Sequence, residues 1–303
     1  MRKILPIVII AMALLSACGE SYQAKRRMSA AERAHADSID KASLKIAVLP
    51  TLDCMPLYVA RYEGLFDTLG VEVHLKPFTA QMDCDTALER RRVEGMVTDV
   101  VRALRLQQRG MRLQMPVATN AYWQLITNHN ARIRELKQLS DKMVAMTRYS
   151  ATDMLTTIAV DSAKPKYSVF RVQINDVKVR LAMLLNNEMD AVMLTEPQAT
   201  TARIHGNPVL MDSRNKDLRL GVIAFNADAM DSPRRKKQLR LFLQAYNQAC
   251  DSLNKLGIRH YADILESDLG TDAKTIKALP KLSFPHAHSP RQHDINKANI
   301  KWN

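Results

Sequence analysis

The sequence predicts an α/β protein with two lobes, each a mostly parallel sheet flanked by helices. Two observations indicate this fold class. Residues 44–77 run as an apolar strand, a loop, a helix and a second strand, and adjacent parallel strands require such a crossover helix. Residues 189–197 resemble residues 93–99 of the first half: both have an acidic residue, an apolar stretch and then a threonine followed by an acid. The 303 residues, 47% of them hydrophobic, suffice for two lobes with sizeable cores.

The chain begins with the features of a bacterial export signal. Residues 1–18 have a basic start, an apolar stretch of about a dozen residues, too short to span a membrane comfortably, and small residues before a cysteine. The letters LSAC at 15–18 match the lipobox, in which Cys18 is acylated and becomes the first residue of the mature protein. An ordinary cleaved signal peptide is the alternative. Residues 19–43 are polar and aperiodic, which predicts a flexible tether.

The first lobe is predicted over residues 44–118 together with 226–303. Its first unit has strands near 44–49 and 72–77 around a helix near 56–69, and a loop follows over 78–85. The further elements expected here are a helix over 86–92, a buried strand within 93–99, a helix over 100–109, a strand over 113–118 and an amphipathic helix from Ser232 to near Leu253.

The second lobe is predicted over residues 119–225 and repeats the same kind of unit. Its expected elements are strands over 142–146 and 169–172, a helix over 176–185 and a return strand over 218–226. The repeat places Thr98-Asp99 and Thr195-Glu196 each at the carboxyl end of a strand. Chance similarity between two buried helix-strand units is the alternative explanation of this loose repeat.

Several of these stretches resemble one family. The P-L-Y-V-A segment at 56–60 and E-G-L-F-D-x-x-G-V-E-V-x-L at 63–75 resemble the amino-terminal signature of periplasmic solute-binding proteins of ABC importers. The most similar branch takes nitrate, sulfonate, taurine or thiamine-pyrimidine precursors. Residues 196–199 resemble that family's E-P segment, and 285–302 resemble its serine-proline stretch with a helix ending in tryptophan.

The resemblance implies a type II periplasmic binding protein fold that encloses a small molecule between its lobes. It also implies delivery to an ABC permease and its ATPase subunits, with no cofactor and no catalysis. With the lipobox, we expect a monomer that is anchored by lipid to a bacterial envelope and faces the periplasm or the outer cell surface. The alternatives are an enzyme on the same two-lobed fold, against which the export signal argues, and a surface lipoprotein that binds a protein or polymer.

Charge and motif patterns exclude other classes. The net charge of +13 includes basic runs at 25–27, 90–92 and 234–237, but aromatic residues make up only 5% and no nucleic-acid motif accompanies them. Solvated helix faces explain these runs better than nucleic acid. His286, His288 and His293 lie without a Cys or Glu nearby, so a solvated loop is favoured over a metal site. No nucleophile elbow, phosphate loop or dinucleotide fingerprint is present.

Ligands of open α/β sheets bind beyond the carboxyl ends of the strands, where this sequence places many polar side chains. Asp83 is also suited to cap a helix. Cys54 and Cys84 follow adjacent strands, and both a disulfide and two reduced thiols are compatible with that placement. The candidate ligand-binding residues are Thr51, Asp53, Thr79, Gln81, Asp83, Thr98 and Asp99 in the first lobe and Tyr122, Trp123, Arg148, Tyr149, Ser150, Thr195 and Glu196 in the second, with Thr147 and Thr152 in the same loop region.

The expected charge of the ligand follows from the acids at this edge. At an effective dielectric constant near 20, a carboxylate 4 Å from a bound anion opposes its binding by about 4 kcal/mol. Aromatic rings at Tyr122, Trp123 and Tyr149 suit a flat cation. We therefore expect a cationic or aminopyrimidine-like ligand, with a sulfonate or nitrate bound by hydroxyls and Arg148 as the alternative. The five acids in question are Asp53, Asp83, Asp85, Asp99 and Glu196.

Overall fold

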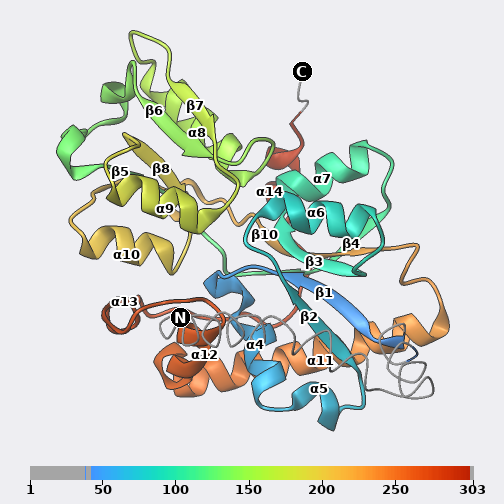
Figure 1. Cartoon of the computed structure of the whole chain (residues 1–303). Helices are drawn as coiled ribbons and strands as arrows, with labels where there is room; N and C mark the ends of the chain where they lie inside the picture. Colours follow the sequence, from blue (N-terminus) through green and yellow to red (C-terminus); the bar gives the residue numbers. More distant parts are fainter. Residues whose placement is uncertain (1–37, 39–41, 301–303) are drawn as a thin grey trace, which may run out of the picture. The chain divides into compact units, whose positions relative to one another are not determined.

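The computed structural model describes residues 38 and 42–300, and residues from Leu44 onward form one compact unit (Figure 1). The predictions for the export signal, for Cys18 and for most of the tether lie outside the described residues, as does Trp302. The ordered chain contains two five-stranded sheets with flanking helices, so the predicted fold class is confirmed. None of the helices within residues 42–300 is both long and apolar enough to cross a membrane.

The first sheet has the order β2-β1-β3-β10-β4 and forms the first lobe. Strands β2, β1 and β3 are parallel, whereas β10 is antiparallel to both β3 and β4. The apolar run that predicted β1 is buried along nearly its whole length. The strands are β1 (Leu44–Val48), β2 (Val73–Pro77), β3 (Gly95–Asp99), β4 (Leu113–Ala118) and β10 (Gly221–Asn226).

Helices cover this sheet on both sides (Figure 1). The long helix α11 packs beside α4 and α5, while α6 and α7 lie against β3 on the other side. The helices of this part of the chain are α4 (Met55–Tyr62), α5 (Leu65–Thr68), α6 (Gln81–Glu89), α7 (Val100–Gln108), α11 (Pro233–Leu256), α12 (Ala262–Ser267), α13 (Ala273–Ala278) and α14 (Gln292–Ala298), with 3-10 turns η1 (Leu52–Cys54) and η5 (Ile258–Tyr261).

The second sheet has the order β7-β6-β8-β5-β9 and forms the second lobe. Its pairings match those of the first sheet position by position, with β5 as the antiparallel member between β8 and β9. Its elements are β5 (Gln124–Thr127), η2 (His129–Ala131), η3 (Leu136–Leu139), β6 (Met143–Met146), α8 (Ala151–Ala163), β7 (Phe170–Gln173), α9 (Val177–Leu185), β8 (Ala191–Leu194), α10 (Gln198–Ile204), β9 (Val209–Asp212) and η4 (Ser213–Lys216).

The two sheets therefore share one topology, in which β3 and β8 hold equivalent central places. The sequence echo between residues 93–99 and 189–197 falls on these two strands. In each sheet the antiparallel strand is the one through which the chain enters from the other lobe. Strand β10 pairs within the first sheet from Gly221 onward, although the sequence assigned residues up to 225 to the second lobe.

One predicted loop is a helix. Helix α6 begins at Gln81, so Asp83 and Asp85 lie in its first turns and not in the expected loop over 78–85. The reason is an apolar face at helical spacing, because Cys84, Ala87 and Leu88 are all buried against the core. Helical burial of this face outweighs the turn tendency of the polar residues between them.

Two short connections join the lobes and touch each other. The amide of Thr119 donates to the carbonyl of Gly221 at 2.9 Å, and Trp123 exchanges hydrogen bonds with Ser213 at 2.9 and 3.0 Å. A Cβ atom at Gly221 would lie 2.2 Å from Thr119 Oγ1 and 2.6 Å from Ala121 Cβ. Only glycine permits the connections to run this close.

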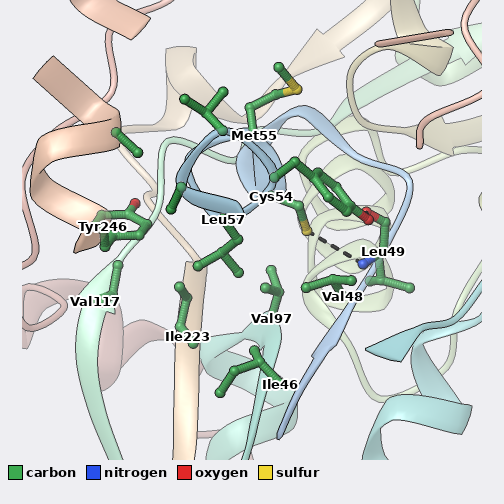
Figure 2. Packing of buried hydrophobic residues seen from close by; sticks show 14 of the residues in the cluster. Ile46, Val48, Leu49, Cys54, Met55, Leu57, Val97, Val117, Ile223 and Tyr246 are labelled. Atoms are coloured by element: carbon green, nitrogen blue, oxygen red, sulfur yellow. Dashed lines mark hydrogen bonds between the residues drawn. The ribbon is translucent and has the colours of Figure 1, made fainter. Parts of the chain in front are cut away.

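The main core of the first lobe lies between the sheet and helices α4 and α11 (Figure 2). Figure 2 shows Ile46, Val97 and Ile223 of three strands below Leu57 of α4, with Tyr246 of α11 to one side. On α11, Phe242 stacks on Phe66 with ring centroids 6.0 Å apart and meets Phe225 edge-on at 5.4 Å. Phe242 and Tyr246 are both buried, as expected for one face of the amphipathic helix that the sequence predicts here.

Replacement of Phe242 by alanine should therefore lower the free energy of unfolding by about 3–5 kcal/mol, because the change removes a fully buried ring. Phe170→Ala is the matched control. The side chain of Phe170 is 54% exposed, so its removal should lower the free energy of unfolding by less than about 1 kcal/mol. Urea denaturation followed by circular dichroism measures both. Equal losses for the two variants would contradict the packing described for α11.

Candidate functional site

A cavity lies between the lobes at the carboxyl ends of both sets of parallel strands. Its volume is about 40 Å³, taken as the space open to the centre of a water molecule. One water requires about 10–15 Å³ by that measure, so the cavity suits a small molecule. The lining residues are Leu49, Thr51, Asp53, Thr79, Gln81, Val97, Thr98, Trp123, Thr152, Asn175, Val177, Arg180 and Thr195.

Half of the candidate residues from the sequence meet at this cavity. Thr51, Asp53, Thr79, Gln81, Thr98, Trp123 and Thr195 all line it. The Gln81 side chain donates from Nε2 to Thr98 Oγ1 at 3.2 Å, which links two of the strand ends. With Thr152, the lining contains five threonines from the two lobes, whose hydroxyls can donate or accept hydrogen bonds. Seven of the residues predicted at strand ends and in the adjoining loops therefore lie around one cavity.

The cavity wall also contains an arginine that was not among the candidates from the sequence. Arg180 lies on α9 and is 4% exposed, with no ion pair to any described residue. Its Nη1 donates to Thr147 Oγ1 at 2.7 Å and to the carbonyl of Ile174 at 2.8 Å, while its Nε has no partner within residues 42–300. Burial lowers the pKa of Arg180 to about 10, opposed by nearby Asp176, so the guanidinium is charged at neutral pH.

A sequence signal for Arg180 does exist. The buried residues of α9 are Val177, Arg180 and Leu184, at the spacing of one helix face. An arginine on an otherwise apolar buried face requires a specific partner, because an uncompensated charge is costly to bury. The strand-end rule does not reach Arg180, because this residue lies within a helix and not in a loop after a strand.

Asp53 is the acid that faces the cavity. It lies on η1 directly after β1, is 8% exposed and has no ion pair within the described part of the chain. Thr119 Oγ1 donates to its Oδ2 at 3.4 Å, and a second hydrogen bond comes from the side chain of Thr51. Burial raises the pKa of Asp53 above its usual value, and these hydrogen bonds partly oppose that effect.

Asp85 and Asp99 belong to a cluster on one side of the cavity and do not line it. Asp99 caps α7 by accepting from the amide of Arg102 at 2.9 Å. Burial raises the pKa of Asp99 to about 6, and its Oδ2 has no partner among the described residues. The Arg102 guanidinium pairs with Asp85 and also donates to the carbonyl of Arg148 in the second lobe at 3.2 Å.

Of the predicted residues around the start of α8, Thr152 lines the cavity, whereas Arg148, Tyr149 and Ser150 do not. Ser150 is buried and caps α8 through the amide of Thr152, and its hydroxyl donates to the carbonyl of Thr147 at 2.7 Å. Tyr149 lies under the guanidinium of Arg105, which is 4.1 Å from the ring centroid. Arg148 is exposed, and Asp83 is exposed on α6. None of these four side chains is part of the cavity wall.

Glu196 and Tyr122 form a buried network behind the cavity. Glu196 is 2% exposed and accepts from Tyr122 Oη and from Arg203 Nη2, each at 2.7 Å. Arg214 covers the Tyr122 ring at 3.9 Å from the centroid. The backbone of Glu196 also reaches the other lobe, because its carbonyl accepts from the amide of Leu52 at 2.9 Å. The acid is therefore a neutralised structural group.

The three cysteines of the described chain are free buried thiols. Cys54 Sγ accepts from the amide of Leu49 at 3.4 Å, which Figure 2 shows beside β1. Cys84 lies on α6 with its side chain in the core. Of the two states left open by the sequence, the structure has reduced Cys54 and Cys84.

The histidines near the carboxyl end have other partners. His286 Nε2 lies 2.8 Å from Asp251 Oδ1, and His288 Nδ1 lies 2.9 Å from the carbonyl of Ser289. Within residues 42–300 no group of three or more His, Cys, Asp or Glu side chains has the placement to hold a metal ion.

The buried thiols should alkylate slowly in the native protein. Burial raises the pKa of all three, that of Cys250 to about 12, and only the thiolate reacts. At pH 8 we expect iodoacetamide to label Cys54, Cys84 and Cys250 more than about 100-fold more slowly than in urea. Peptide mapping without reduction reads out each site, and a linked Cys54–Cys84 peptide pair would contradict the reduced state.

Comparison with known proteins places the fold in a family. The sequence model of the NMT1-like family matches residues 37–262. A ligand-binding component of an ABC-type import system from Staphylococcus aureus, solved with zinc, has a TM-score of 0.67 at 18% identity, over 81% of this chain and 86% of that one. No protein with a curated description matches the sequence.

Two further solved structures have named ligands. The periplasmic aliphatic sulphonate binding protein of Escherichia coli has a TM-score of 0.63 at 16% identity, over 79% of this chain and 84% of that one. The periplasmic nitrate-binding protein of Synechocystis PCC 6803 has a TM-score of 0.65 at 14% identity, over 78% of this chain and 68% of that one. The family match covers most of the chain and these structures share its fold, so the protein belongs to the NMT1-like family and has the fold of periplasmic binding proteins.

Proposed function

We propose that this protein is the solute-binding component of an ABC importer and that it encloses a small solute with an anionic group between its lobes. The observation that carries the proposal is Arg180, a buried guanidinium on the cavity wall that forms no ion pair with any described residue. The names of two structures with this fold, a sulphonate-binding and a nitrate-binding protein, support the same ligand chemistry.

The surroundings of Arg180 suit an oxyanion. Its Nε–H has no protein acceptor within the described residues, and a charge-assisted hydrogen bond to an anion would be stronger than a neutral one. Thr152 lies in the first turn of α8, a helix of 13 residues whose amino terminus also favours negative charge. Threonine hydroxyls on both lobes add neutral donors.

The same contacts remove the grounds for a cationic or aminopyrimidine ligand. That expectation counted five acids at the cavity edge, but only Asp53 lines the cavity. Asp85 is paired with Arg102 and Glu196 with Arg203, while Asp99 caps α7 and Asp83 points to solvent on α6. Acids that are neutralised locally do not repel a bound anion.

Capture would occur by closure of the lobes about the two connections. The closed arrangement has direct contacts across the lobes, including Leu52 N to Glu196 O at 2.9 Å and Gln198 Nε2 to Pro50 O at 2.9 Å. A solute bound by both lobes favours this state, because it makes its full set of contacts only there. We propose lobe boundaries near residues 44–118 plus 221–303 and near 119–220, moved from the sequence-based boundary to include all of β10.

No bond needs to be made or broken for this function. The rival, an enzyme on the same fold, requires a reactive group in the cavity, whereas the lining offers hydroxyls, amides, one acid and one arginine. Incubation with candidate solutes and mass spectrometry separates the two, because a binding protein returns its solute unchanged.

Arg180→Gln should weaken binding of small anions at least about 100-fold, because it removes a charged donor inside a desolvated cavity. Calorimetry with a short alkanesulfonate, nitrate, sulfate and an aminopyrimidine provides the measurement. Lys178→Gln is the control, since it changes the same charge on an exposed position of the same helix. Tight aminopyrimidine binding that Arg180→Gln leaves unchanged would overturn the anion proposal.

The anchor is a separate proposal that rests on the sequence. We infer that Cys18 carries the lipid that holds the protein on the bacterial envelope, facing the periplasm or outer surface, where it meets its permease. Cys18→Ser should abolish incorporation of labelled fatty acid and move the protein from the membrane to the soluble fraction. An unlabelled wild-type protein would exclude the anchor without bearing on solute binding.

A further inference from the structure

A basic surface lies at the edge of the first sheet where its parallel strands begin, opposite the cavity. We call this edge the amino edge. It consists of residues 42–45, 69–72, 89–94 and 109–112, which lead into β1, β2, β3 and β4, and of residues 226–240, which follow β10 and include the first turns of α11. These segments contain eleven basic residues and five acids. The basic runs at 90–92 and 234–237 therefore belong to one surface.

Contacts of Glu94 show that these segments lie side by side. Its side chain accepts from the amide of Lys45 at 2.7 Å and from Arg235 Nη2 at 3.2 Å. Its carbonyl accepts from the amide of Asn226 at 2.9 Å, and the amide of the next residue donates to the carbonyl of Arg112 at 2.8 Å. The charges of the amino edge are therefore contributed by neighbouring segments of one surface.

The acids of the amino edge are paired, whereas several of its basic residues are not. Each acid lies within 3.2 Å of a basic side chain, in the pairs Glu72–His74, Glu89–Arg109, Glu94–Arg235, Asp228–Arg112 and Asp231–Lys236. Five further basic residues are exposed and form no ion pair with any described residue, namely Arg90, Arg91, Arg92, Lys237 and Arg240. The surface therefore has positive charge that the protein itself does not neutralise.

Both basic runs occupy positions that local structure disfavours. Arg91 has a φ of 55°, in the left-handed region where glycine or asparagine is more usual. Residues 234–237 lie in the first turns of α11, which have no acid, although the helix dipole disfavours positive charge at that end. Residues that break a local rule are expected where function requires them.

Attraction of an anionic solute into the cavity does not explain this charge. The five residues of β1 separate the amino edge from the cavity end of the sheet by about 17 Å, roughly twice the Debye length at physiological salt. The segments at the cavity end, 49–55, 78–85 and 99–102, contain four acids and one arginine. The excess of positive charge in this lobe therefore faces away from the cavity.

A groove next to α11 adds apolar surface to the amino edge. Its volume is about 620 Å³, on the same measure as the cavity. Its acids, Asp231 and Asp251, are paired with Lys236 and His286. Apolar side chains beside basic ones suit the boundary between the head groups and the acyl chains of a membrane. The lining includes Met230, Leu239 and Leu243 together with Arg112, Lys236 and Arg240.

We propose that the amino edge binds the surface of a lipid bilayer with anionic head groups. The phosphates would supply the counter-charges that the five unpaired basic residues lack, and each basic residue near such a surface adds to the affinity. Strand β1 begins at this edge, so the chain that precedes Leu44, and with it the proposed lipid on Cys18, is attached to the lobe on this side. The lobe would then hold its cavity on the side away from the lipid.

Sedimentation with vesicles tests the proposal without the anchor. The chain from Ser38 to Asn303 keeps every described residue and the cores of both lobes, but lacks Cys18 and the basic run at 25–27. It should bind vesicles of phosphatidylcholine mixed with phosphatidylglycerol at least about 30-fold more tightly than phosphatidylcholine alone. Binding should be present at about 0.1 M salt and lost at about 1 M, where the Debye length falls to about 3 Å.

A matched pair of triple variants locates the binding surface. Arg90→Gln with Lys237→Gln and Arg240→Gln should weaken binding to the anionic vesicles about 100-fold, which is about fivefold for each charge. The control removes three exposed charges from the second lobe and should leave binding nearly unchanged. It combines Arg134→Gln, Lys166→Gln and Lys178→Gln. Circular dichroism checks that both variants are folded, as expected for changes at exposed positions.

Three results would overturn the proposal. They are equal binding to the two kinds of vesicle, equal losses in the two triple variants, and binding to polyglutamate but not to vesicles, which would assign the amino edge to an acidic protein partner. The first of these needs only the unmodified sequence, so it decides the question even if a variant does not fold. None of them bears on solute capture, which is tested separately through Arg180→Gln.

Discussion

The geometry of this protein depends on the two connections between β4 and β5 and between β9 and β10. Each delivers an antiparallel strand into the sheet of the other lobe, so the parallel strands of both sheets end at the same interlobe space. The contact of Thr119 with Gly221 leaves no room for a side chain at Gly221. The site therefore exists because these two segments lie against each other, and neither lobe alone contains both Asp53 and Arg180.

A buried polar network ties the site to these connections. Tyr122 and Arg203 both donate to Glu196, Arg203 also donates to Gln124, and Gln124 donates to Asp212 at 2.6 Å. Arg214 donates to Asp212, and its guanidinium covers the ring of Tyr122, so the network leads back to its first residue. Since every member is satisfied by another, the network fixes the loop after β8 with little freedom to rearrange locally.

The sequence predicted the parts of the structure that follow from local patterns. The apolar run of β1, the helix after it and the convergence of strand ends gave the fold class, and the same rule correctly brought Thr51, Thr98 and Thr195 to one cavity. The rule could not show which acids lack an ion pair. The partner of Asp85 is Arg102 and that of Glu196 is Arg203, which lie on helices 17 and 7 residues away along the chain. The strand-end rule missed Arg180 because this residue lies within a helix, and because the lack of an acceptor for its Nε is a property of the folded interior.

The closed state does not depend on the solute alone. Arg102 donates to the carbonyl of Arg148 across the lobes, Thr201 and Thr275 share a hydrogen bond at 3.0 Å, and Gln198 reaches Pro50. These contacts hold the lobes against each other, so under the proposed function a solute would supply only the remaining free-energy difference between an open and a closed state. Unpaired charges at Asp53 and Arg180 act in the opposite direction, because closure desolvates both. Under the proposed function, a solute that neutralises both charges would therefore favour the closed state.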